Sequence, residues 1–574
     1  MASIGEKTTP LGFAGALHLL RRTTYRPTKA RANALASLTP AQALDQLFTF
    51  TAPAMPKPIK NTDGSQYFPD FDNPGAVYDA TYNNDYSYEF INYWLYNAHK
   101  SDTIQWKLSM FLHSIYITTY TSVYMQWDNM ALLLQYTNKS LKELAYKMTL
   151  NQRMIYFLSN YLNVKNSPNQ NYGREFLELF TILKGEQVAE GDYTNYTEHD
   201  VQQAARVLTG FTGTYGGNVR MNYLDKGLTT NIAGHAPNPI NAGWTYAATN
   251  LPTGLCNIAQ HDTGNKTFSA AFGNQTINGS SVLTGAYTAY DELQAFINMI
   301  FNQQETARNY ARRLYRFFVN SNISQEAEAD IITPLAANLM STQNGVTYNL
   351  ESAVKLLLKS WHFYDEEDSI IGDEHLGSKI KSSTDLLLNP LAETNIAMVN
   401  PMANPLHFHN YFNTLRSRIW IAGMQLFNSV DVNGYPGYSA KPNYDKNWVT
   451  IATLNQRYNA GWIQTLLNGY TNNGFTTRLD SPEFVRTSGY FTDPANADVL
   501  IDEFMEILFP SKPQGLRYGF FENALLNGLS KANWATTWNT WVADVANTTK
   551  KNAVRTALNR LILAMAKSTE YQVM

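Results

Sequence analysis

Ionisable side chains that could do chemistry gather between residues 174 and 206. Glu175 and Glu178 are three positions apart, so on a helix their carboxylates would lie on the same side. Two carboxylates placed in this way could hold one divalent metal ion or act as an acid–base pair. Together with nearby charged residues they form what we call the signature cluster: Arg174, Glu175, Glu178, Asp200 and Arg206.

The signature cluster also has a structural interpretation, which we favour. Apolar residues surround the two glutamates, and a buried charge without a partner is costly. The carboxylates would then bind Arg174, Arg206 or exposed helix ends and hold two helices together. Asp200 fits a capping position at a helix N-terminus, where negative charge is favourable. Buried ion networks of this kind change pKa values without any catalysis.

A second set of candidate residues lies in the sequence HDTGNK, at residues 261–266. Adjacent His and Asp side chains could ligate a metal or form the base end of a hydrolytic site. The same sequence is typical of an ordinary turn, in which Asp262 binds its own backbone and Gly264 takes a positive φ. We call four of these residues the loop motif: His261, Asp262, Gly264 and Lys266.

The two sets could meet if the loop folds over the helices that carry the signature cluster. Carboxylate and imidazole ligands together suit zinc, manganese or calcium. The sequence thus allows a divalent metal site at four residues: Glu175, Glu178, His261 and Asp262.

Two predicted helices position the signature cluster. The first begins with a capping signal at Ser167 and continues to Leu183. The second begins at Thr197 with a Thr-x-x-Asp box and ends at Gly210. Arg206 points away from the apolar stripe of the second helix, and we expect it to reach a carboxylate of the first.

A stripe of arginines follows on a further predicted helix, at residues 305–319. Arg308, Arg312 and Arg316 recur at four-residue spacing and therefore share one face. Such a stripe could bind an anion or a phosphate group. A solvated face paired with neighbouring acids is the commoner arrangement, and we favour it for this stripe.

Helical patterning dominates most of the chain. Capping signals followed by apolar stripes recur through the first 170 residues, which predicts a mainly α fold with a large multi-helix body. Residues near 212–285 are rich in Gly, Asn and Thr without a helical period, and predict a loop insertion with short β-hairpins. The expected organisation has three parts: a helical body at 1–365, a polar connecting segment at 366–410 and a helical C-terminal part at 411–574.

Composition and charge narrow the classes of function. Charged residues make up 16% of the chain and the net charge is -3, which argues against a dedicated nucleic-acid-binding protein. The single cysteine, Cys256, excludes an intramolecular disulfide and a cysteine-rich zinc site. No apolar run has the length of a transmembrane segment. Low charge with abundant Asn, Thr and Tyr favours an exported or cell-surface protein over a cytoplasmic one.

The two helices of the signature cluster resemble the bacterial family called domain of unknown function 1800. The matching residues of the first helix are Asn169, Asn171, Tyr172, Arg174, Glu175, Glu178, Leu179, Phe180 and Thr181. Those of the second are Tyr196, Thr197, Asp200, Val201, Ala205, Arg206, Leu208, Thr209 and Gly210. The chain departs from the family pattern at Gly173, Phe176 and Phe211. Many relatives carry His where this chain has Phe180, so a metal role for that position is absent from this chain.

Other segments match the same family in order, so the resemblance spans nearly the whole chain. They are HLLRRTTYRPT from His18, HDTGNK from His261, ARRLYRFFV from Ala311, LGSKIKSSTDLLL from Leu376 and the stretch from Asn433 to Gly461. The resemblance implies no established activity. It does imply a candidate partner, because relatives are often encoded beside an alkaline-phosphatase-like family.

Two functions from different classes are compatible with these residues. The first, which we favour, is a non-catalytic, exported or surface-associated scaffold or binding protein that binds a protein partner or assembles with itself. The second is a metal-dependent hydrolase that uses the carboxylate–histidine site. A divalent metal is the cofactor that this second hypothesis requires.

Overall fold

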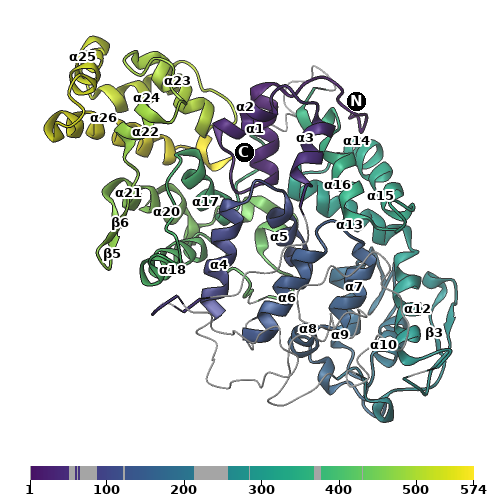
Figure 1. The fold of residues 1–574 in the computed structure, drawn as a ribbon. Coiled ribbons are helices and arrows are strands. Elements are labelled where there is room, and N and C mark those ends of the chain that lie inside the picture. Colours follow the sequence, from purple (N-terminus) through teal and green to yellow (C-terminus); the bar gives the residue numbers. More distant parts are fainter. Residues whose placement is uncertain are drawn as a thin grey trace.

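Several of the helices in Figure 1 begin where the sequence places a capping side chain ahead of an apolar stripe. The Thr39 hydroxyl accepts from the Gln42 backbone N–H, and the Gln42 side chain accepts from the Thr39 backbone N–H. The same capping box recurs at Thr197 and Thr288. A computed structural model shows that the fold is mainly α, which confirms the predicted class.

The structure describes most of the chain. The described residues are 2–50, 59–60, 62–64, 87–119, 123–212, 256–283, 285–366, 377–429, 431–459 and 461–574.

The helices of the first part of the chain precede the signature cluster. They are α1 (Gly12–Thr23), α2 (Lys29–Leu35), α3 (Pro40–Leu47), α4 (Ser87–Lys100), α5 (Gln105–Ile115), α6 (Val123–Gln135), α7 (Leu141–Thr149), α8 (Gln152–Phe157) and η2 (Asn160–Leu162).

The middle of the chain contains the signature cluster, the loop motif and the arginine stripe. Its first elements are α9 (Asn171–Glu175), the π-helical η3 (Phe176–Phe180), β1 (Gln187–Ala189), β2 (Asp192–Tyr193), α10 (Glu198–Val207), η5 (Ile258–Gln260), β3 (Lys266–Thr267), η6 (Ala270–Phe272) and β4 (Thr276–Ile277). Then come α12 (Ala289–Phe301), α13 (Gln304–Phe318), α14 (Gln325–Ala327), η7 (Glu328–Ile332), α15 (Thr333–Met340), α16 (Leu350–Leu358) and η8 (His362–Tyr364).

The remaining elements are again mostly helical. They are α17 (Ser383–Glu393), α18 (Pro405–Ile421), α19 (Pro436–Ser439), η9 (Tyr444–Trp448), α20 (Ile451–Asn459), α21 (Gly461–Asn468), β5 (Tyr470–Asn472), β6 (Phe475–Thr477), α22 (Ser481–Thr487), α23 (Ala497–Leu508), α24 (Leu516–Leu526), α25 (Lys531–Val542), α26 (Thr548–Ala566) and η10 (Glu570–Gln572).

Small antiparallel hairpins are the sheets of the described residues: β1–β2, β3–β4 and β5–β6. In β3–β4, Lys266 lies opposite Ile277 and Thr267 opposite Thr276. This hairpin confirms the β-hairpin character predicted for the insertion near 212–285. Most of that insertion lies outside the described residues.

The helices pack around two hydrophobic clusters. Helices α1, α7, α12, α13 and α16 contribute to the first, and α4, α17, α18, α23 and α26 to the second. The partly buried Tyr438 packs against both clusters and so marks their junction. Helix α17 lies within the predicted connecting segment at 366–410, and all of its residues are buried. The three-part division of the chain stays a prediction.

Helix α1 joins the two clusters through buried arginines. Figure 1 shows it between the C-terminal helices and the group α14 to α16. Arg21 donates to the carbonyls of Phe509 and Ile507 at the end of α23, while Arg22 donates to Val319 at the end of α13. Guanidinium groups are favourable at helix C-termini, where carbonyls lack helical partners. Across the described ranges, no helix combines the length and apolar character needed to cross a bilayer.

Candidate functional site

The first signature helix is shorter than the sequence predicted. It begins at Asn171 rather than Ser167, because the Asn169 side chain accepts from the Asn171 N–H at 2.9 Å and holds the preceding residues in a turn. After Glu175 the helix continues as the π-helical turn η3. This turn ends at Phe180 rather than at Leu183. π-Helical turns occur frequently at functional sites.

A hydroxyl group closes the π-helical turn. Thr181 Oγ1 donates to the carbonyl of Phe176 at 2.6 Å, five residues earlier. The next bend places Leu183 at φ 63, which a helix cannot accommodate. These local contacts explain why apolar spacing overestimated the length of the helix at both ends.

Helices α9 and α10 pack closely and share an ion pair. An added Cβ at Gly173 would lie 3.1 Å from the Cβ of Ala204, so this departure from the family pattern permits the close approach. Arg174 Nη2 lies 2.8 Å from Glu198 Oε1 across the two helices. The carboxylate that joins the two helices is therefore Glu198, and not Glu175 or Glu178 as predicted.

Asp200 serves as a capping residue, as the sequence predicted. Its Oδ2 accepts from the Thr197 backbone N–H at 2.8 Å and completes the capping box of α10. The same carboxylate accepts from the Ser269 N–H at 2.7 Å and from the Ser269 hydroxyl at 2.6 Å. Asp200 therefore also fixes the segment that follows the loop motif against α10.

The expectation for Arg206 was wrong. Its Nε and Nη2 donate to the carboxylate of Asp262 at 2.7 and 3.2 Å, and not to a carboxylate of the first helix. The reason is tertiary, because the loop motif folds against the C-terminal end of α10 and presents its own carboxylate there. This pairing joins the signature cluster to the loop motif.

The loop motif forms a buried ionic cluster with Glu292 of α12. His261 Nδ1 donates to the Thr209 carbonyl at 2.6 Å, and His261 Nε2 lies 3.1 Å from Glu292 Oε2. Lys266 Nζ lies 2.5 Å from Glu292 Oε1 and also donates to the Asp262 carbonyl. The side chains of His261, Lys266 and Glu292 are fully buried. No local pattern in the sequence indicated Glu292, which lies far along the chain from the motif.

In the described part of the chain, the predicted metal ligands contact different partners. Glu178 lies 2.6 Å from Lys184 Nζ and accepts from the Tyr196 hydroxyl, whereas His261 contacts Glu292 and Asp262 binds Arg206. Within the described ranges, no group of three or more His, Cys, Asp or Glu side chains is placed to hold a metal ion. The metal site stays a prediction without support from this geometry.

The surroundings of Glu175 alter its acidity. Burial, together with the negative charge of Glu178, raises its pKa to about 7. A raised carboxyl pKa favours the protonated native state, so wild-type stability should fall as pH rises from about 4.5 to 7 and then level off. Glu175→Gln should remove this pH dependence and raise the free energy of unfolding at pH 8. The expected gain is only about 1 kcal/mol, because water screens a partly exposed carboxylate.

Thermal unfolding from pH 4.5 to 8 measures this effect. Glu186→Gln, which changes an exposed carboxylate after the same helix, is the control and should keep the wild-type slope. An unchanged pH dependence in Glu175→Gln would contradict the assignment.

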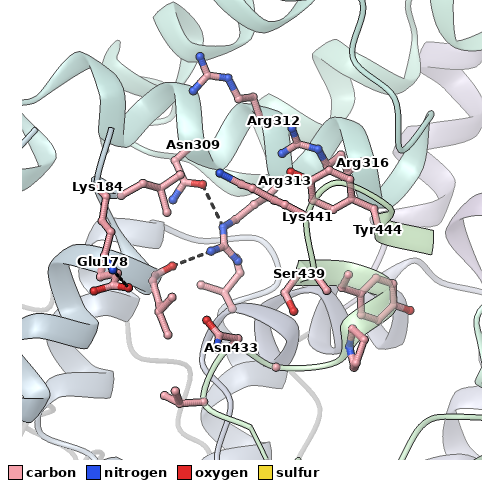
Figure 2. A pocket seen from close by; sticks show the side chains of 18 of the residues that line it. Glu178, Lys184, Asn309, Arg312, Arg313, Arg316, Asn433, Ser439, Lys441 and Tyr444 are labelled. Carbon is pink, nitrogen blue, oxygen red and sulfur yellow. Dashed lines mark hydrogen bonds and ion pairs between the residues drawn. The ribbon is translucent and has the colours of Figure 1, made fainter. Parts of the chain in front are cut away.

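A cavity of about 920 Å³ opens between η3, α13 and the segment that carries α19 and Tyr444 (Figure 2). Helix α13 presents one face to it, and the π-helical turn presents Glu178 and Leu179. The opposite segment is held in place at Gly437, where an added Cβ would lie 2.0 Å from the Trp448 ring. The cavity lies beside Tyr438, at the junction of the two hydrophobic clusters. Small-molecule sites favour such junctions.

Arg313 of α13 lies in the cavity wall and is fixed by two hydrogen bonds. Its Nε donates to Asn309 Oδ1 at 3.1 Å, and its Nη2 donates to the Leu179 carbonyl at 2.6 Å (Figure 2). The amide of Asn309 in turn donates to the Thr181 carbonyl at 2.6 Å. The π-helical turn thereby determines where this guanidinium group lies.

Arg316 and Lys441 add two more positive charges to the cavity. The Arg316 guanidinium stacks on the Tyr444 ring, with its central carbon 4.2 Å from the ring centroid. Its Nε is buried and has no hydrogen-bond partner among the described residues. Burial lowers the pKa of Arg316, and partial burial with repulsion from Arg316, Arg312 and Arg313 lowers the pKa of Lys441. We call Arg313, Arg316 and Lys441 the cavity cations.

The cavity cations differ from the other arginines of α13. Arg312 lies 2.6 Å from Glu328 and also contacts Glu305, and Arg308 pairs with Glu305 at 3.8 Å. The cavity cations form no ion pair with any carboxylate in the described part of the chain. The predicted paired face is therefore present at two positions of the stripe, while Arg316 lies apart in the cavity.

Sequence patterns alone did not reveal the cavity cations as a group. Arg316 belongs to the predicted arginine stripe, whereas Arg313 lies beside it and off its face. Lys441 lies in a segment without helical or strand periodicity. Only the packing of that segment against α13 brings the three together.

A family model described as "Protein of unknown function (DUF1800)" matches residues 18–573. The chain belongs to this family. No curated protein sequence and no solved structure shows a significant match to it. In this DUF1800 chain, three of the segments that carry the resemblance meet at the cavity. They are the first signature helix, the segment from Ala311 to Val319, and the stretch from Asn433 to Gly461.

Proposed function

We propose that this DUF1800 chain is a non-catalytic binding protein, and that its cavity holds an anionic group of the ligand. The observation that carries the proposal is the set of cavity cations, which line about 920 Å³ without a paired carboxylate in the described residues. Like charges that converge in a partly buried site repel one another, and a bound anion relieves that repulsion.

The arrangement of the cavity also suits binding rather than structural support. An ion pair that only holds helices together is satisfied within the chain, as in Arg174 with Glu198. Arg313 and Arg316 are instead oriented by neutral groups, namely the Asn309 amide, the Leu179 carbonyl and the Tyr444 ring. Neutral partners hold a cation in place while leaving its charge available to a ligand.

The proposal specifies a site for the binding protein that the sequence predicted. Export, self-assembly and the alkaline-phosphatase-like partner stay predictions that depend on other observations. Glu178, the signature carboxylate in the cavity wall, is paired with Lys184 and accepts from Tyr196, so its contacts serve the fold.

Anions should therefore stabilise the protein through this cavity. Citrate should raise the melting temperature above that in potassium chloride of equal ionic strength at pH 7.5, since a ligand that binds only the native state stabilises it by mass action. An anion at about 100 times its Kd adds roughly 2.7 kcal/mol. Lys441→Met should remove most of this extra stabilisation. Thermal unfolding measured by circular dichroism tests both expectations.

Lys446→Met is the matched control, because Lys446 is an exposed lysine on the neighbouring η9 and does not line the cavity. It should respond to citrate as the wild type does. Equal responses of the wild type and Lys441→Met would overturn the proposed function, because the stabilisation would then arise elsewhere on the surface.

A further inference from the structure

We infer that the anionic group in the cavity is a phosphate monoester carried by an organic molecule. The inference rests on the proposed function and names its class of ligand. It is drawn from the number of unpaired cations, the hydrogen-bonding groups they offer and the size of the space beside them.

Among the described residues, the cavity lining carries five cations and four carboxylates, and two of those carboxylates, Glu178 and Glu305, are paired with Lys184 and Arg312. Three cavity cations lie on the wall shared by α13 and the segment at 433–441 (Figure 2). A carboxylate or a sulfate ester brings a single charge and would compensate only one of them. A phosphate monoester carries about -1.5 to -2 near pH 7 and offers three strong acceptor oxygens.

The donors of the site match a phosphate group in kind. Arginine presents a planar fork of N–H groups that binds phosphate oxygens in pairs, and lysine adds a compact point charge. Arg313 uses Nε and Nη2 within the fold, and no hydrogen bond with a described residue engages its Nη1. The Tyr444 ring orients the Arg316 fork without consuming its hydrogen bonds. Each cavity cation thus keeps at least one donor for a ligand oxygen.

The volume of the cavity implies an organic body attached to the phosphate. At about 920 Å³ it lies near the upper end of the range for small-molecule sites, roughly 300–1,000 Å³, and far exceeds what one phosphate ion fills. Beyond the cavity cations, the lining contains apolar and aromatic side chains, neutral polar ones, and charged residues that include Glu178, Glu305 and Asp431. Leu179, Leu183, Val432 and Tyr438 represent the first kind, and Asn433 and Ser439 the second. A sugar or aromatic body would contact both kinds.

Titration calorimetry at pH 7.5 with three probes tests the inference. Phenyl phosphate should bind at least about tenfold more tightly than phenyl sulfate, which has the same body but one charge fewer, because the second charge strengthens the hydrogen bonds from the cavity cations. Phenyl phosphate should also bind more tightly than inorganic phosphate, which lacks the body.

Variants localise the binding to the cavity. Lys441→Met and Arg316→Gln should each weaken phenyl phosphate about tenfold or more, while Lys446→Met should leave it unchanged. Lys441 is exposed, so Lys441→Met keeps the test valid even if Arg316→Gln fails to fold.

The outcomes separate this inference from the proposed function. If citrate stabilises the protein through Lys441 but phenyl sulfate binds as tightly as phenyl phosphate, the phosphate monoester is wrong and anion binding stands. The same holds if inorganic phosphate binds as tightly, because the organic body would then contribute nothing. If no anion acts through Lys441, both proposals fall.

Discussion

Glu292→Ala is expected to lower the free energy of unfolding by about 3–5 kcal/mol, as breaking a buried ion pair does when one partner is removed. The Glu292 carboxylate is fully buried and contacts Lys266 Nζ at 2.5 Å and His261 Nε2 at 3.1 Å. It also accepts from the Ser280 backbone N–H at 2.9 Å. Truncation leaves the buried Lys266 ammonium without its carboxylate partner and the Ser280 backbone N–H without its acceptor.

The loss should be visible both globally and locally. Chemical denaturation should show an earlier unfolding midpoint, and hydrogen–deuterium exchange should lose protection at 256–283, where the loop motif and the β3–β4 hairpin lie. Asp45→Ala is a suitable control, because the Asp45 side chain is 72% exposed and its pair with Lys355 should contribute little. If Glu292→Ala changes stability no more than this control, the cluster does not hold the loop motif.

Asp385→Ala should have an effect of similar size, about 3–5 kcal/mol, in the second hydrophobic cluster. Asp385 on α17 pairs with Lys107 of α5, and both side chains are 3% exposed. The Ser382 hydroxyl donates to the same carboxylate at 2.7 Å. Burial also lowers the pKa of Lys379 and Lys381 to about 8, while the charge of Asp385 acts to raise the pKa of both. Loss of Asp385 would leave several buried cations with less compensation.

A double variant distinguishes a lost ion pair from a packing defect. Lys107→Met with Asp385→Ala should be more stable than Asp385→Ala alone, because no unpaired ammonium remains buried. Denaturation midpoints of the two single variants and the double variant give the coupling between the residues. Additive losses would mean that the carboxylate acts through packing and not through its charge.

Much of the local structure could be predicted from residue order. Thr197 and Asp200 form the capping box that their spacing indicated, and the helix predicted at 305–319 is observed as α13. The helix predicted from Ser167 to Leu183 is shorter at both ends in the structure, because side-chain hydrogen bonds of Asn169 and Thr181 compete with helical ones. Such competition depends on geometry that apolar periodicity does not capture.

The functional residues were predicted less well, and for a different reason. The partner predicted for Arg206 was wrong, and no pattern indicated Glu292. The contacts of these two residues with Asp262 and His261 span 56 and 31 positions of the chain. Three of the candidate metal ligands, Glu178, His261 and Asp262, each contact a different partner. Side-chain chemistry limits which partners are compatible, while the choice among them belongs to the packing.

By itself the sequence determined the family, the mainly α class and individual helix caps such as the box at Thr197, because these depend on interactions between residues a few positions apart. The tertiary structure alone decided that the π-helical turn, α13 and the segment at 431–444 enclose a cavity, and that three cations line it. Those elements are separated by more than a hundred residues and are brought together only when two hydrophobic clusters pack against each other. Contacts at that range follow from burial of the whole chain, which no local pattern encodes.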